Sequence, residues 1–208
     1  MNGGYRRLVD SSLDWGQELG NLKRWIDGHR ADVPENVYVS YFGSTPPSSY
    51  GLEASWLPGY FRIEFLEPKS RFAKELSLEA GVYCISATSL QCVYNSSFPG
   101  PWRDDYEQQY RLLDDLFLAY SENRGKQAEL DALLARTGLP NWGKAFLLFE
   151  SARFGRLCEY LRRREPDDHV NHAILIYRLS ADEIRDALFR PPVEHFPEPG
   201  SPYDNVPY

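Results

Sequence analysis

The stretch GVYCISATSLQ, residues 81–91, decides the fold of this chain. Its first half, Gly81 to Ile85, is an apolar run that predicts a buried strand. Its second half turns polar at Ser86, Thr88 and Ser89, as a strand does where it runs into the amino terminus of a helix. A strand that leads directly into a helix is typical of an α/β protein.

Strand and helix patterns alternate outward from this stretch. Further strands are predicted at residues 7–9, 36–43 (NVYVSYFG), 61–67 (FRIEFLE) and 172–180 (HAILIYRLS), and helices at residues 15–29, 104–120, 126–136, 142–163 and 181–189. Ser180 is expected to cap the last helix, and residues 44–60 are expected to form a long loop.

This alternation predicts an α/β fold with a layered, largely parallel sheet flanked by helices. A helical insertion, about residues 104–165, is expected before the last strand. We expect one domain over residues 1–190 and a proline-rich tail over residues 191–208 that is extended or disordered.

Composition excludes several classes of function. The 208 residues carry a formal net charge of -7, which argues against a nucleic-acid partner because such a partner requires a basic face. No apolar run is long enough to span a membrane and no signal-peptide core is present, so the chain as given is expected to be soluble. The 3 cysteines lack the spacing of a zinc site or a disulfide framework and are expected to be buried or free thiols.

Three predicted strands end in polar stretches: DSSLDWGQ, SYFGS and SATSLQ. Ligands bind at the carboxyl ends of parallel strands, where these endings would share one edge of the sheet. The candidate ligand-binding residues are therefore Asp10, Ser11, Asp14, Trp15, Gln17, Tyr41, Gly43, Ser86, Thr88 and Gln91. The alternative is that they are helix caps and turn residues, because Ser, Thr, Asp and Gly favour such positions.

Other chemistry has weaker support in the sequence. There is no dinucleotide-binding fingerprint, P-loop or nucleophile elbow, and we expect no cofactor. In DDHVNH, the alternation of a strand should place His169 and His172 on opposite faces, so a polar turn is favoured over a metal site and no metal is expected. Five aromatic residues offer either a sugar-binding groove or anchors for the loop: Trp15, Tyr50, Trp56, Tyr60 and Trp102.

The same motifs carry a family resemblance. The order VDSSLDWGQELGNLKRWI, VYVSYFGSTPPSSYGL, WLPGY, GVYCISATSLQCVY and HAILIYRL resembles the soluble C-terminal region of bacterial membrane glycosyltransferases of the dolichyl-phosphate-mannose protein mannosyltransferase type. The match spans residues 6–91 and 169–179 and leaves the insertion and the tail uncovered. Ser12 stands where that family often has Asn, and the insertion is longer than the family pattern implies.

The resemblance implies an accessory or ligand-binding domain of a glycosyltransferase-like membrane protein, excised from or encoded apart from its membrane portion. It implies a glycan, a lipid-linked sugar or an acceptor as ligand, and a membrane-embedded partner or parent region. It also implies an extracytoplasmic location, where otherwise a cytoplasmic one is expected, and no catalysis by this chain alone. Two alternatives stay open: a small hydrolase or transferase that uses Asp10 or Asp14, and a structural interaction domain.

Overall fold

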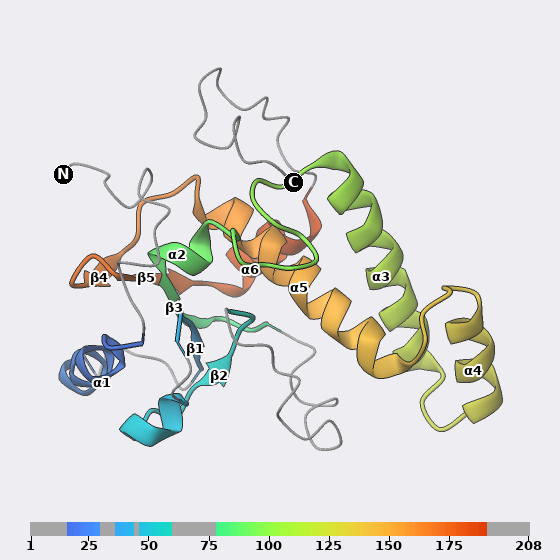
Figure 1. Ribbon diagram of the computed structural model, residues 1–208, viewed down its shortest axis with the longest axis horizontal. Helices are drawn as coiled ribbons and strands as arrows, with labels where there is room; N and C mark the ends of the chain where they lie inside the picture. The colour runs from blue at the N-terminus through green and yellow to red at the C-terminus, as the bar shows by residue number, and fades with distance from the viewer. Residues whose placement is uncertain (1–15, 30–35, 44–45, 60–77, 191–208) are drawn as a thin grey trace.

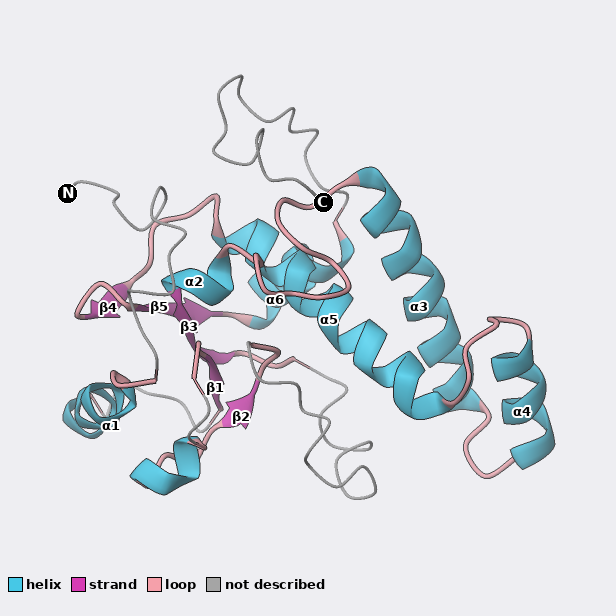
Figure 2. Ribbon diagram, in the orientation of Figure 1, coloured by secondary structure: helices cyan, strands magenta, loops and turns pink. Residues whose placement is uncertain are grey.

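The computed structural model describes residues 16–29, 36–43, 46–59 and 78–190, and these form a five-stranded sheet flanked by helices (Figures 1 and 2). The strands are β1 (Val37–Ser40), β2 (Ser55–Trp56), β3 (Gly81–Ser86), β4 (Asp168–Val170) and β5 (Ile174–Leu179). The helices are α1 (Leu19–Gly28), the short 3-10 helix η3 (Pro47–Tyr50), α2 (Ala87–Leu90), α3 (Asp104–Glu122), α4 (Gln127–Ala135), α5 (Trp142–Leu161) and α6 (Ala181–Phe189).

The α/β class and the flanking helices are confirmed, but the sheet is mixed. Its order is β2-β1-β3-β5-β4, in which β1 pairs parallel with both β2 and β3, whereas β5 pairs antiparallel with both β3 and β4. The prediction of a largely parallel sheet was wrong because it missed β4. A tight turn at Asn171 and His172 reverses the chain after β4, so that β4 and β5 form a hairpin.

Most of the remaining described helices and strands lie where the sequence pattern predicts them. The step from β3 into α2 is confirmed, as is Ser180 as the cap of α6, where Ser180 and Glu183 form a reciprocal capping box. The predicted loop over residues 44–60 contains η3 and the two-residue strand β2. The predicted strands at residues 7–9 and 61–67 and the proline-rich tail lie outside the described residues.

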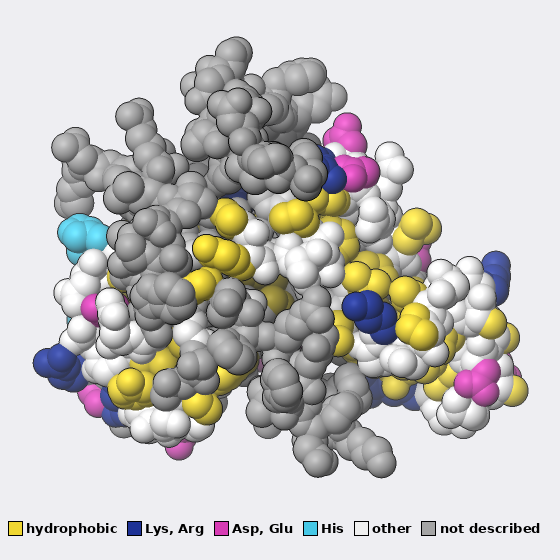
Figure 3. Space-filling model, in the orientation of Figure 1, with side chains coloured by type: hydrophobic (Ala, Val, Ile, Leu, Met, Phe, Trp, Pro, Cys, Tyr) yellow, Lys and Arg dark blue, Asp and Glu magenta, His cyan; other side chains and the backbone are white. Residues whose placement is uncertain are grey.

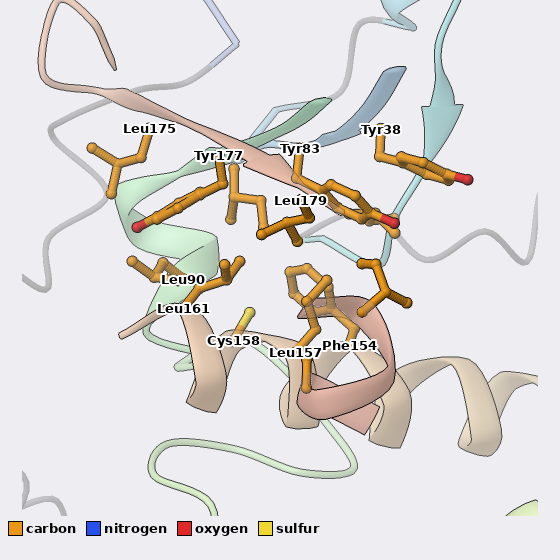
Figure 4. Packing of buried hydrophobic residues seen from close by; sticks show 14 of the residues in the cluster. Tyr38, Tyr83, Leu90, Phe154, Leu157, Cys158, Leu161, Leu175, Tyr177 and Leu179 are labelled. Atoms are coloured by element: carbon orange, nitrogen blue, oxygen red, sulfur yellow. The ribbon is translucent and has the colours of Figure 1, made fainter. Parts of the chain in front are cut away.

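Alternate side chains of the central strands enter two different cores. On one face, Tyr83 and Ile85 of β3 join Leu175 and Tyr177 of β5 in a cluster covered by α2, α5 and α6 (Figure 4). On the other face, Val82 and Cys84 of β3 belong to a second cluster, which also includes Leu19 and Leu22 of α1. The two-residue period of a strand therefore accounts for both layers of helices.

Helix α5 belongs to two cores. Its second half contributes Phe154, Leu157 and Leu161 to the cluster on the sheet, as Figure 4 shows. Its first half contributes Phe146 and Phe149 to a separate, largely aromatic cluster with α3. A helix of this length spans about 30 Å, long enough to pack against the sheet and against α3.

A polar network reinforces the contact between α3, α5 and the end of α6. The carboxylate of Glu107 accepts hydrogen bonds from Trp102 Nε1 at 2.8 Å and Arg111 Nε at 2.8 Å, and it pairs with Arg156 Nε at 2.7 Å. Arg111 also donates to the carbonyl of Phe189 at 3.0 Å. Arg156 is buried, so Glu107 supplies the compensating charge that a buried guanidinium requires.

The surface is mixed in character. Figure 3 shows hydrophobic side chains among polar ones over the α3 and α5 side, and Leu112 and Leu118 of α3 are both exposed. Among the helices of the described residues, none has the length and apolarity needed to cross a bilayer.

The junction of the two cores depends on a glycine of α5. A Cβ atom at Gly155 would lie 2.9 Å from Cζ3 of Trp102, a distance that requires the indole ring to move. We therefore expect Gly155→Leu to lower the free energy of unfolding by about 1–3 kcal/mol, as overpacking of a core does. Gly28→Leu is the matched control, because a Cβ there meets nothing within 4 Å. Urea titrations of both variants measure the effect, and equal stabilities would contradict this account of the junction.

Candidate functional site

The candidate site is the edge of the sheet at the carboxyl ends of β1 and β3. These strands pair in parallel, from Val37 opposite Val82 to Ser40 opposite Ile85. The polar endings SYFGS and SATSLQ therefore leave the sheet at the same edge, as the sequence predicts. We call this region, formed by residues 40–43 and 86–94, the strand-end site.

Gly16, from the predicted polar ending DSSLDWGQ, lies against the strand-end site. Asp10, Ser11, Asp14 and Trp15 lie outside the described residues, but Gly16 and Gln17 are described. A Cβ atom at Gly16 would lie 3.1 Å from Cε2 of Tyr41 and 3.4 Å from the Cα of Gly43. Gly16 also has a φ of 87°, which favours glycine. This close approach brings Gln17, whose side chain is exposed, next to the strand-end site.

Buried polar side chains are concentrated here. Of the six buried non-aromatic polar or charged side chains in the described part of the chain, four belong to the strand-end site: Ser40, Ser86, Thr88 and Gln91. The other two are Arg153 and Arg156 of α5. Burying a polar group is costly unless a partner compensates it, so this concentration requires specific partners.

Both serines of this group, Ser40 and Ser86, form hydrogen bonds within the protein. Ser86 caps α2: its Oγ accepts a hydrogen bond from the backbone N–H of Ser89 at 3.1 Å and donates to Ser89 Oγ at 3.0 Å. Ser40 Oγ donates to the carbonyl of Pro58 at 2.6 Å. The alternative reading, that these residues are helix caps, is therefore confirmed for Ser86.

Aromatic rings surround the same edge. The ring of Tyr41 meets Trp56 edge to face, with centroids 6.0 Å apart, and Phe42 packs against Tyr94 with centroids 4.8 Å apart. Tyr41 and Phe42 are buried, whereas Tyr94 is 43% exposed. Phe42 and Tyr94 are not among the predicted site residues, although both lie within three residues of one.

The other aromatic residues of the predicted groove do not share one place. Trp102 lies between α3 and α5, and Tyr50 packs beside Gly20 of α1. Trp15 and Tyr60 lie outside the described residues. Of the described members, only Trp56 contacts a residue of the strand-end site, through Tyr41.

Helix α1 is held beside the sheet by polar contacts with the β4–β5 hairpin. Glu18 Oε2 accepts hydrogen bonds from Asn21 Nδ2 at 2.6 Å and from Asn171 Nδ2 at 2.7 Å. Two turns after Glu18, Trp25 Nε1 donates to Asp168 Oδ2 at 2.7 Å. These contacts orient the start of α1, and with it Gly16, toward the strand-end site.

The prediction for His169 and His172 was wrong in its geometry. Their ring centroids lie 3.8 Å apart, because His172 occupies the turn after β4 with a φ of 57° and does not continue the alternation of the strand. Figure 3 shows histidine at the surface near this end of the sheet. Within the described ranges, no group of three or more His, Cys, Asp or Glu side chains is arranged to hold a metal ion.

Asp168 makes stability depend on pH. Partial burial opposes its ionisation, but hydrogen bonds from Trp25 and from the backbone of His169 outweigh this effect and lower the pKa of the carboxyl. The stabilisation from a lowered pKa is present above the ordinary carboxyl pKa, about 3.9, and is lost as pH falls through the folded value.

We expect Asp168→Asn to be less stable than the native chain at pH 7, and the difference to narrow at about pH 3. Urea titrations at both pH values provide the measurement. Glu53→Gln, which removes an exposed carboxylate, should leave the pH dependence nearly unchanged. If Asp168→Asn lowers the free energy of unfolding by the same amount at both pH values, the ionised carboxylate of Asp168 does not stabilise the fold.

The strand-end site thus combines four buried polar side chains with an exposed tyrosine and the exposed Gln17. Hydroxyl and amide groups beside an aromatic ring suit recognition of a polar ligand that also has a C–H face. No protein-family model, curated protein or solved structure matches this chain.

Proposed function

We propose that this chain is an accessory or ligand-binding domain of a glycosyltransferase-like membrane protein, and that its strand-end site recognises a sugar. The ligand is a glycan, a lipid-linked sugar or a glycosylated acceptor. The observation that carries the proposal is the gathering of buried polar side chains at the carboxyl ends of two parallel strands. The resemblance of DWGQ, SYFG and ISATSLQ to the family pattern supports it, because SYFG, ISATSLQ and Gly16 of DWGQ lie at the same edge.

The chemistry of the site favours a sugar over other small ligands. Sugars present hydroxyl groups around their rim and C–H groups on their ring faces, so they need amide and hydroxyl partners beside a flat aromatic surface. Gln17 and Tyr94 are the exposed side chains at the site that supply an amide and an aromatic ring. Phe42 packs behind Tyr94 and limits the movement of its ring.

Recognition is a better account of this site than catalysis. The polar side chains among residues 40–43 and 86–94 are hydroxyls, one amide and the thiol of Cys92, and none of them is a carboxylate. Asp10 and Asp14, the predicted catalytic candidates, lie outside the described residues. In the proposed function, the membrane-embedded partner or parent region carries out transfer on the extracytoplasmic face, and this domain binds the sugar.

Titration with hexose 1-phosphates and with a panel of short oligosaccharides, followed by NMR, tests the proposal. We expect saturable shifts at Gln17, Tyr41 and Tyr94. Tyr94→Ala should weaken binding about 2- to 10-fold, corresponding to about 0.5–1.5 kcal/mol for an aromatic contact. Gln17→Ala should also weaken binding without lowering stability, since that side chain is exposed.

Tyr50→Ala is the matched control. Tyr50 is 39% exposed, close to the 43% of Tyr94, but it packs on α1 beside Gly20 and not against Phe42. The control should bind the probes as the native chain does. Absence of binding to every probe, or equal losses in Tyr94→Ala and Tyr50→Ala, would overturn the assignment of the site.

A further inference from the structure

Two of the cysteines meet where α2 packs against α5. Cys92 follows α2 by two residues, and Cys158 lies on α5. Both are buried in the cluster that covers one face of the sheet. Figure 4 shows Cys158 within this cluster, on the same side of the sheet as Leu90 of α2.

Both cysteines contact the same backbone carbonyl. The backbone N–H of Cys92 donates to the oxygen of Ser89 at 3.0 Å, and the Sγ of Cys158 lies 3.9 Å from that oxygen. Each thiol also affects the ionisation of the other, which places the two side chains close together. The two cysteines therefore meet at one backbone carbonyl, although they are far apart in the sequence.

A partly buried cation, Arg162, lies at the end of α2. Arg162 Nη1 donates to the carbonyl of Leu90 at 2.9 Å, and its Nη2 pairs with Glu159 Oε2 at 2.8 Å. Interaction with the Cys158 thiol lowers the pKa of Cys92; burial opposes this effect, and the charge of Arg162 adds to it. Burial instead raises the pKa of Cys158, and the third cysteine, Cys84, has its pKa raised to about 12.

We propose that Cys92 and Cys158 form a reversible intramolecular disulfide, with Cys92 as the attacking thiolate. This arrangement has the two parts that thiol–disulfide exchange needs, a stabilised thiolate and an adjacent thiol. Cys84 lies on the opposite face of β3, in the other core, and takes no part.

The oxidant is a second disulfide, of the glutathione or oxidoreductase class. The Cys92 thiolate attacks one sulfur of that disulfide and releases the other as a thiolate, which leaves a mixed disulfide on Cys92. Cys158 then loses its proton and attacks Cys92 Sγ, which releases the second thiolate of the oxidant. The protein loses two protons and two electrons, and the oxidant is reduced to two thiols.

The bond would join the end of α2 to α5. Because both sulfur atoms are buried, exchange requires the α2–α5 contact to open locally, and its rate depends on that opening. The disulfide would then restrict the movement of α2, whose buried residues Thr88 and Leu90 belong to the strand-end site.

The test is to equilibrate the full chain in glutathione buffers of increasing oxidised-to-reduced ratio, quench with acid, and count thiols by alkylation in denaturant. We expect the number of free thiols to fall from 3 to one, with a Cys92–Cys158 crosslink in peptide mass spectra. Cys84→Ser should show the same loss of two thiols, while Cys92→Ser and Cys158→Ser should show no intramolecular crosslink. Three results would overturn the proposal. They are three free thiols in the oxidised native chain, a crosslink that includes Cys84, and stable glutathione adducts without an intramolecular crosslink.

The pH dependence of the oxidation rate is a second measurement that needs no cysteine variant. The rate should reach half its maximum below pH 8.5, the approximate pKa of an ordinary thiol, because the thiolate forms as pH rises through the lowered pKa of Cys92. Arg162→Gln should move that midpoint to higher pH. Arg163 pairs with the same Glu159 from an exposed position, so Arg163→Gln should leave the midpoint unchanged. Circular dichroism confirms that each variant is folded. A native midpoint at or above pH 8.5 would contradict the role of Cys92.

Discussion

The contact of one helix with two cores is the constraint on which this structure depends. Helix α5 packs on α3 through its first half and on the sheet through its second half. At the junction, Gly155 allows Trp102 to lie against the helix, and the indole N–H of Trp102 reaches Glu107, which also compensates buried Arg156. Displacing α5 would therefore expose apolar surface in both clusters and leave a buried charge without its partner.

The features that could be predicted from sequence are those with local causes. A hydroxyl at the end of an apolar run caps a helix whatever the surrounding fold, so the starts of α2 and α6 follow from Ser86 and Ser180. Strand direction has no such signature, because alternating side chains look alike in parallel and antiparallel pairs. The three-residue strand β4 is short and polar, and the chain reverses into its partner β5 through Asn171 and His172, which adopt left-handed backbone conformations.

The same distinction applies to the strand-end site. The prediction that two of its polar endings meet is confirmed because β1 and β3 pair in parallel. The contact between Phe42 and Tyr94 depends instead on the turn after α2, where Cys92 has a φ of 54°. Trp102 was a reasonable candidate for a sugar-binding groove by residue type, but the space left by Gly155 accommodates it in the helical core.

Helix α2 connects the two proposals physically. It is only four residues long, too short to be stable alone, so its position is set by its contacts. At its start, Ser86 holds the backbone of Ser89; at its end, Arg162 and Cys158 of the α5 region contact the carbonyls of Leu90 and Ser89. A change in the thiol contact therefore acts on the helix that carries Thr88 at the strand-end site. Any coupling between the redox state of the cysteines and sugar binding would pass through this short helix, and its strength would depend on how firmly the Ser86 cap holds it.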